Sequence, residues 1–176
     1  VLHTFNRYGQ RIDEVEFHPA YHELMRRLME NQVHNFSWVH KEKPGATVVR
    51  AALGYMSGQA DAGTGCPLSM TFSAVPAMRH DPALAQVWES RLMSSVYDPR
   101  TLPAEQKNGC TMGMGMTEKQ GGSDVRANTT RAIRQADGSY EIVGHKFFFS
   151  APMCDAHLVL AQAEGGMTTL LLPRVL

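Results

Sequence analysis

The spacing of apolar residues changes once along this chain of 176 residues, and that change limits the folds it can adopt. Over the first part, apolar side chains recur every three or four positions, which is typical of helices with one buried face. From Cys110 to Thr117 the spacing is two, because cysteine and methionine alternate with threonine and glycine, as in a strand. The sequence therefore predicts an α+β protein with a helical domain over residues 1–107 and a β domain over residues 108–176.

The helical part contains start and stop signals for several helices. Pro19, Pro67 and Pro82 each suit a first helical turn, because the missing proline N–H has no partner there in any case. A further helix is expected from Ala46 to Asp61, and Pro76 is expected to kink or end the helix that contains it. The apolar stripes expected to pack in the core are Tyr21, Leu24, Met25, Leu28 and Met29; Val49, Ala52, Leu53 and Met56; Leu68, Phe72 and Val75; and Leu84, Val87, Trp88 and Leu92.

Beyond residue 108 the sequence predicts an antiparallel sheet. Asp137-Gly138 and Gly165-Gly166 are hairpin turn signals, and residues with strand periodicity flank each of them. The expected strands cover residues 110–117, 129–134, 140–143, 146–150, 156–162 and 168–172. Because the chain begins at Val1 and stops just after the last strand, we expect it to be part of a longer protein with an incomplete sheet.

Composition excludes several classes of protein. Seventeen basic and seventeen acidic side chains give a formal net charge of zero, whereas nucleic-acid binding usually needs a basic surface that attracts phosphates. Cys66, Cys110 and Cys154 contain no CxxC pair, so we expect buried free thiols in a reducing, cytoplasmic compartment rather than disulfides or a zinc ribbon. No apolar run approaches the roughly eighteen residues of a membrane span, so no membrane partner is expected.

The loop after the first expected strand, within Gly115–Asp124, is the most informative segment. Its paired glycines, Gly121 and Gly122, lack Cβ atoms, so several backbone N–H groups can converge on one anion. The neighbouring Ser123 hydroxyl is a further donor. Taken alone, this pattern is more often a tight surface turn, and it is neither a Walker loop nor a Rossmann fingerprint.

Two separate segments resemble the flavin-binding strands of the acyl-CoA dehydrogenase family. Gly115–Ala127 follows the family pattern of a small residue, an aliphatic residue, Thr-Glu, two variable residues, Gly-Gly-Ser-Asp, two more and a small residue. Gly144–Ser150 resembles the second family element, Gly-x-Lys-x-Trp-Ile-Thr. Lys119 stands where most members have proline, and Phe148 where most have tryptophan. In these two departures, and in further runs such as Asp155–Gln162, the sequence resembles the adaptive-response branch of the family. The resemblance to that branch extends over nearly the whole chain.

The resemblance implies an acyl-CoA dehydrogenase-like fold, with a helical N-terminal domain, a middle antiparallel β-barrel that is incomplete here, and an absent C-terminal helical bundle. It implies FAD as the cofactor, with the Thr117 and Ser150 hydroxyls near flavin N5 and Ser123 at the pyrophosphate. Phe148 would lie against the ring system, keeping an aromatic face but lacking the indole N–H. The expected cofactor-binding residues are Met114, Gly115, Met116, Thr117, Gly121, Gly122, Ser123, Phe148, Phe149 and Ser150.

The resemblance also implies an activity for the whole protein. In this family a carboxylate removes the α-proton of an acyl-CoA while the β-hydrogen passes as hydride to flavin N5. That carboxylate comes from the C-terminal bundle, so no catalytic residue is expected in this chain, and Glu118 is not a candidate. The adaptive-response branch implies induction by DNA alkylation, binding of double-stranded DNA through the C-terminal domain, weak dehydrogenase activity and a homotetramer. The alternative is a metabolic dehydrogenase of short or branched-chain acyl-CoAs, and the chain alone is expected to bind FAD weakly and catalyse nothing.

Two other hypotheses have less support. His18 and His22 lie four residues apart and could share one helix face, but no third metal ligand follows at a suitable spacing, so no metal site is expected. Ser123 could be the nucleophile of a hydrolase, but no nucleophile elbow surrounds it.

Overall fold

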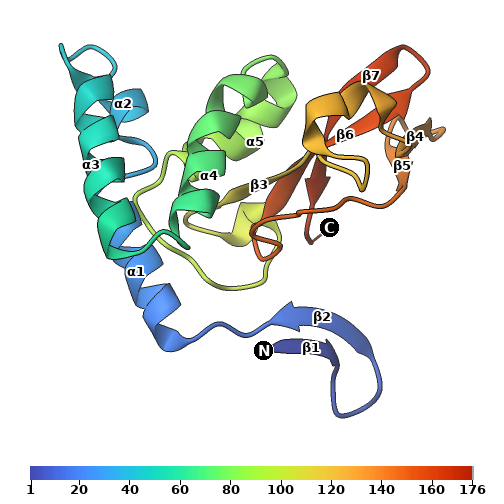
Figure 1. Ribbon diagram of the computed structural model, residues 1–176, viewed down its shortest axis with the longest axis horizontal. Helices are drawn as coiled ribbons and strands as arrows, with labels where there is room; N and C mark the ends of the chain where they lie inside the picture. The colour runs from blue at the N-terminus through green and yellow to red at the C-terminus, as the bar shows by residue number, and fades with distance from the viewer. Residues whose placement is uncertain (176) are drawn as a thin grey trace.

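Helices precede most of the strands in the computed structural model, which describes residues 1–175 (Figure 1). The helices are α1 (Pro19–Glu30), α2 (Phe36–Val39), α3 (Ala46–Ala60), α4 (Gly65–Met78) and α5 (Pro82–Leu92), with short 3-10 helices η1 (Ala104–Gln106) and η2 (Gly122–Ala127). The strands are β1 (Leu2–Phe5), β2 (Arg11–Val15), β3 (Met112–Gly115), β4 (Arg131–Arg134), β5 (Tyr140–Val143), β6 (Ala156–Ala163) and β7 (Gly166–Pro173). The α+β prediction is confirmed, while the boundary at residue 107 stays a prediction, and Leu176 lies outside the described residues. No helix within residues 1–175 is long and apolar enough to cross a membrane.

A β-hairpin opens the chain, so the prediction of a helical region from the first residue onward is wrong. β1 and β2 pair antiparallel, and the hairpin extends away from the helices (Figure 1). The Asn6 side-chain oxygen accepts hydrogen bonds from the N–H groups of Tyr8 and Gln10, at 2.9 and 3.0 Å. Gly9, with φ +78°, supplies the left-handed position of the turn. These strands are too short for apolar spacing to reveal them, and only the turn residues give a signal.

Side-chain caps fix the starts of α1 and α5 where the sequence predicts them. His18 and Asp81 each accept a hydrogen bond from the N–H two residues ahead, at 3.1 and 3.0 Å. Helix α4 begins two residues before Pro67 and continues past Pro76 to end at Met78. The helix therefore ends soon after the internal proline, which removes one backbone donor from its last turn.

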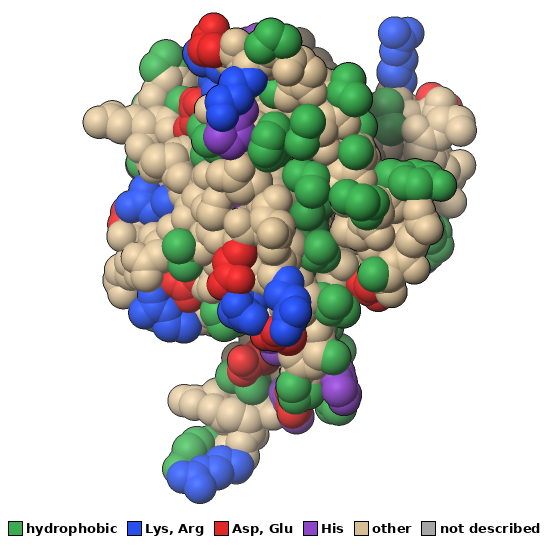
Figure 2. Space-filling view, turned by 90° about the vertical axis from the view of Figure 1, so that its left-hand side faces the viewer, with side chains coloured by type: hydrophobic (Ala, Val, Ile, Leu, Met, Phe, Trp, Pro, Cys, Tyr) green, Lys and Arg blue, Asp and Glu red, His purple; other side chains and the backbone are tan. Residues whose placement is uncertain are grey.

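Helix α3 begins at the predicted residue, but the prediction that its apolar stripe lies in the core is wrong. Val49 and Met56 are 42% and 59% exposed, and Leu53 is half-buried. The buried residue of this helix is Ala46. Hydrophobic side chains accordingly gather on the side of the molecule that faces the viewer in Figure 2. Helical spacing shows which residues share a face, but whether another element covers that face depends on tertiary packing.

The main core joins α4 and α5 to the sheet. Val75 and Leu92 pack in one cluster with Met112 of β3 and Leu158 of β6, and each is at most 4% exposed. The Thr71 hydroxyl of α4, also buried, accepts a hydrogen bond from the Met112 N–H at 3.0 Å. The apolar side of β3 therefore faces the helices, as its alternating pattern predicts.

The five-stranded sheet is mixed, so the prediction of a purely antiparallel sheet is wrong. β4 with β5, and β6 with β7, form the antiparallel hairpins that the turn signals predict. β3 and β4, however, both run parallel to β6. A tight hairpin turn imposes antiparallel pairing, whereas the long connection from β3 to β6 leaves either direction open.

The segment Lys146–Ser150 is not a strand, contrary to the prediction. The chain leaves β5 at Val143 and reaches β6 at Ala156 through irregular backbone. Phe148 has φ +57° and Ala151 has φ +53°, and left-handed residues cannot continue the extended backbone of a strand.

Candidate functional site

The glycines of β3 make room for aromatic rings from other parts of the chain. A Cβ atom on Gly113 would lie 2.3 Å from His157 Cδ2, and one on Gly115 would lie 2.2 Å from Phe149 Cε2. The rings of Phe149 and His157 pack together, with centroids 4.7 Å apart. The face of β3 that carries these two glycines is therefore covered by two side chains of the protein itself.

A buried carboxylate, Glu118, holds the end of β3 against two other segments. Glu118 is 3% exposed and accepts hydrogen bonds from the backbone N–H groups of Thr129 and Thr130, at 2.7 and 3.0 Å. Both threonine hydroxyls donate to it as well, at 2.9 and 2.5 Å, and Lys146 Nζ lies 2.9 Å from Oε1. Burial alone would raise the pKa of Glu118, but these donors outweigh it and hold the pKa well below its usual range. Glu118 is therefore a permanently charged anchor rather than a proton acceptor.

The paired glycines lie in an open loop, unlike those of β3. Gly121 has φ +113°, and a Cβ atom there would meet nothing within 4 Å. A Cβ atom on Gly122 would lie 2.9 Å from Thr117 Oγ1, so the loop folds back on the residue that ends the strand. Ser123 and Asp124 are exposed at the start of η2. The Gly121 N–H donates to the Glu118 carbonyl at 3.0 Å, whereas the first N–H groups of η2, from Gly122 onward, have no partner within that helix.

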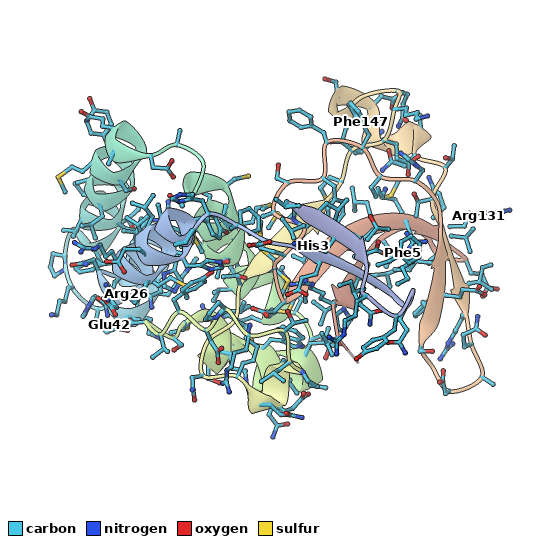
Figure 3. The ribbon with its side chains drawn as sticks, turned by 90° about the horizontal axis from the view of Figure 1, so that it is seen from below. His3, Phe5, Arg26, Glu42, Arg131 and Phe147 are labelled. Carbon is cyan, nitrogen blue, oxygen red and sulfur yellow. The ribbon has the colours of Figure 1, made fainter. Side chains whose placement is uncertain are left out.

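Three consecutive phenylalanines follow Lys146, and they face different surroundings. Phe147 and Phe148 are 53% and 82% exposed, whereas Phe149 packs on β3. Figure 3 shows Phe147 at the outer edge of the molecule, away from the hairpin residues and from α1. The Phe147 N–H nevertheless donates to the Thr117 carbonyl at 3.0 Å. The structure therefore brings the two segments singled out in the sequence, Thr117–Ser123 and Lys146–Ser150, side by side.

An apolar cavity of about 600 Å³ opens next to the second of these segments. It lies between α1, the start of α4 and the irregular segment that leads to β6. Its lining residues are Phe17, Ala20, Tyr21, Leu24, Asp61, Gly63, Thr64, Cys66, Pro67, Ser150, Ala151, Pro152 and Met153. Of these lining residues, only Ser150 is predicted from the sequence as a site residue. The others come from segments far apart in the chain, and no local sequence pattern shows that these segments lie close together in the fold.

A second, polar cavity of about 320 Å³ adjoins the first. Lys107 and Asp155 form a buried ion pair in its lining, and the Thr111 N–H donates to Asp155 at 2.8 Å. The Arg100 guanidinium beside Asp98 holds the pKa of that carboxyl well below its usual range. The charges of Asp98, Lys107 and Asp155 in this cavity therefore already have partners.

The cysteines and the paired histidines have separate surroundings. Cys66 is exposed, so the expectation of buried thiols is wrong for this residue. Cys110 and Cys154 are buried, and burial raises the pKa of each to about 12, which keeps them in the unreactive thiol form. His18 caps α1, and His22 Nδ1 lies 2.8 Å from the Tyr97 hydroxyl. Among residues 1–175, no group of three His, Cys, Asp or Glu side chains is placed to hold a metal ion.

Both halves of the chain match known protein families. Residues 1–99 match the family described as adaptive response protein AidB N-terminal domain, and residues 113–176 match the acyl-CoA dehydrogenase middle domain. The chain belongs to the AidB branch of the acyl-CoA dehydrogenase family. It is 52% identical over 176 residues to AidB of Escherichia coli strain K12, which is named as an acyl-CoA dehydrogenase. That match covers 99% of this chain and 32% of the E. coli protein, so the chain spans about a third of its relative.

Solved structures of other proteins share the fold. The apo form of Bd2924 superimposes with a TM-score of 0.83 at 25% identity, over 98% of this chain and 35% of that one. Caenorhabditis elegans ACDH-11, solved in complex with C11-CoA, gives a TM-score of 0.76 at 26% identity, over 96% and 28% of the two chains. The predicted acyl-CoA dehydrogenase-like fold is thereby confirmed, with the mixed sheet as its correction.

Proposed function

We propose that this chain is the flavin-contacting part of an FAD-dependent, acyl-CoA dehydrogenase-like protein of the adaptive response to DNA alkylation. One observation carries the proposal. The Glu118 cluster joins Thr117–Ser123 to Lys146–Ser150, the two segments whose residue types match the flavin strands of the family. Two matched elements that also meet in space support a single cofactor site better than either motif alone.

The residues present fit a flavin at several positions. Gly122 opens η2, so its N–H has no partner within that helix and could bind the pyrophosphate, and the Ser123 hydroxyl is exposed beside it. The Gly121 N–H already donates to the Glu118 carbonyl at 3.0 Å, so Gly121 would contribute only the open space left by its missing Cβ. Phe148 holds an aromatic face in solvent, at 82% exposure, where a flat ring system would cover it. Thr117, whose hydroxyl lies against Gly122, completes this group.

Other predicted contacts fit less directly. Phe149 covers Gly115, so these two residues contact a flavin only if the ring moves off the strand. Met114 and Met116 are half-buried on the opposite face, packed against the main core. The proposed direct contacts are therefore Thr117, Gly121, Gly122, Ser123, Phe148 and Ser150.

The apolar cavity next to Ser150 is the proposed acyl site. Its lining of aromatic, aliphatic and proline side chains suits a hydrocarbon chain, and Ser150 places it against the proposed flavin segment. Flavin, when bound, accepts a hydride from the acyl β-carbon. The residues of this chain orient the thioester and exclude water, while Glu118, charged and buried, holds the segment in place. The C11-CoA bound to ACDH-11 supports an acyl-CoA as the ligand class.

The remaining parts of the proposal concern the whole protein. Double-stranded DNA would bind through a C-terminal domain outside these 176 residues, since the net charge here is zero. The AidB N-terminal family match supports the adaptive-response role, and a cytoplasmic homotetramer is proposed on the same basis. A metabolic dehydrogenase of short or branched-chain acyl-CoAs is the second candidate, and the apolar cavity favours it.

The test is an absorption spectrum of the purified full-length protein, followed by titration with isovaleryl-CoA and with duplex DNA. Flavin bands that persist with the thioester, together with salt-dependent DNA binding, support the alkylation-response function. Bands that bleach fully and quickly at enzyme-like rates favour the metabolic dehydrogenase. A full-length protein without flavin contradicts both.

A further inference from the structure

Two anchors hold the ends of the segment from Lys146 to Ala151. At the first end, Lys146 Nζ pairs with Glu118 at 2.9 Å, and the neighbouring Phe147 N–H donates to the Thr117 carbonyl at 3.0 Å. At the other end, the Ala151 carbonyl accepts a hydrogen bond from the Cys154 N–H at 3.0 Å and lies 3.3 Å from Nε2 of His157 in β6. The segment is thereby fixed to the end of β3 and to the start of β6.

Between the anchors the backbone adopts a disfavoured conformation. Phe148 and Ala151 have φ values of +57° and +53°, in the left-handed region that residues with a Cβ atom rarely occupy. Such conformations persist only where the surroundings hold them, and they are concentrated at ligand sites. The Phe148 side chain is 82% exposed, so its own packing does not supply the hold. The hold comes from the two anchors and from the Phe149 ring between them, which packs on Gly115 and His157.

The Glu118 anchor is rigid. Four donors from Thr129 and Thr130 fix the carboxylate, and the Glu118 and Lys146 side chains are only 4% and 9% exposed. A buried ion pair with satisfied hydrogen bonds has one geometry, unlike an exposed pair, which samples many. Lys146 is directly followed by the three phenylalanines, so its position sets where their backbone begins.

We propose that the Glu118–Lys146 pair is a positioning device that keeps Phe148 in its left-handed conformation beside the loop Thr117–Ser123. With the pair intact, the exposed aromatic face and the open glycine loop belong to one surface. Without it, the aromatic segment relaxes to ordinary backbone angles and leaves the loop. The inference rests on the proposed function only for the identity of the ligand, FAD.

The first measurement needs no flavin. Hydrogen exchange of the full-length protein, followed by mass spectrometry, compares the wild type with Lys146→Met and Lys146→Arg. Exchange across residues 146–151 is expected to rise about tenfold or more in Lys146→Met, because local opening no longer has to break the pair. Lys146→Arg, which keeps the charge, is expected to stay near the wild type, as is Lys43→Met, which removes an exposed lysine far from the segment. Lys146→Gln provides a milder change if Lys146→Met does not fold.

The second measurement is FAD affinity, with the apoprotein titrated by fluorescence quenching. Lys146→Met is expected to lower the melting temperature, because the buried Glu118 carboxylate loses its counter-charge, and also to weaken FAD binding about tenfold in protein kept well below its melting transition. Lys146→Arg is expected to restore the affinity. A merely structural role would lower the melting temperature and leave the FAD affinity of the folded protein unchanged.

The outcomes separate this inference from the proposed function. Unchanged exchange in Lys146→Met overturns the inference, whatever the flavin does. Faster exchange with unchanged FAD affinity also overturns it, because the segment is then not positioned for that ligand. A wild-type protein that binds no FAD contradicts the proposed function and, with it, the ligand named here, while the exchange result still decides whether the pair holds the segment.

Discussion

Gly113 and Gly115 in β3, and Gly121 and Gly122 in the loop that follows, are the same residue type used in opposite ways. In the strand, each missing Cβ is replaced by an aromatic ring of the protein, His157 on Gly113 and Phe149 on Gly115. In the loop, a Cβ on Gly121 would meet nothing within 4 Å, so the space belongs to solvent or to a ligand. Closely spaced glycines therefore do not by themselves indicate a ligand site. A ligand can bind beside them only where no side chain of the protein fills the space that the missing Cβ leaves.

The largest effect is expected at Glu118, which lies between the two glycine regions. Glu118→Gln should lower the free energy of unfolding by about 4 kcal/mol, because the buried Lys146 cation loses its counter-charge. Urea unfolding of the full-length protein, followed by circular dichroism, measures this. Glu105→Gln, at an exposed glutamate, is the matched control. A loss below about 1 kcal/mol, the range of an exposed pair, would contradict the buried geometry.

The same anchor predicts a dependence on pH. The pKa of Glu118 is lowered in the folded protein from an ordinary value of 4.5, so its stabilisation is fully present above that value. It is lost progressively as the pH falls below 4.5 toward the folded pKa. The difference in unfolding free energy between the wild type and Glu118→Gln should therefore shrink between about pH 5 and pH 3, and a constant difference would exclude this linkage.

A smaller loss is expected from filling the strand glycines. Gly113→Val should cost about 2 kcal/mol, because the side chain would overlap the His157 ring and force it to shift. His157→Ala in the same protein should recover part of the loss by vacating that space. If Gly113→Val alone leaves the free energy of unfolding unchanged, the strand glycines are not needed to accommodate the aromatic rings. The proposed difference between the strand glycines and the loop glycines is then wrong.

The smallest effect on stability is expected in the loop. Gly121→Ala should cost about 1 kcal/mol, through the strain of φ +113° alone, since nothing crowds the new methyl group. If the loop binds FAD, Gly121→Ala should weaken FAD binding more than Gly113→Val does, although Gly121→Ala lowers the free energy of unfolding less. Measuring both quantities for both variants tests whether stability and ligand binding are divided between the two glycine regions.

Elements with local start or turn chemistry could be predicted from the sequence. Asp81-Pro82 marks the start of α5, and Asp137-Gly138 and Gly165-Gly166 mark the turns of two hairpins; all three are confirmed. In each case a few neighbouring residues determine the conformation, whatever the rest of the chain does. The family resemblance, carried by Gly115–Ala127 and Gly144–Ser150, is confirmed as well.

The incorrect predictions have non-local causes. The apolar stripe of α3 is mostly exposed because spacing cannot show whether a partner element is present. The parallel pairing of β3 with β6 depends on a long connection that imposes no direction. The left-handed backbone of Phe148 has no signal in a run of phenylalanines, because its surroundings impose it. The apolar cavity, apart from Ser150, also escaped prediction, since its walls come from α1, α4 and the approach to β6.

Phe17, Tyr21 and Met153 line both the apolar and the polar cavity, and the rings of Phe17 and Tyr21 stack with their centroids 4.3 Å apart. These three side chains therefore separate the two cavities and form part of the lining of each. A substitution there cannot enlarge one compartment without altering the other, so natural drift or engineering at these positions changes both together. Independent tuning is left to residues that face a single compartment, such as Leu24 on the apolar side and Thr101 on the polar side.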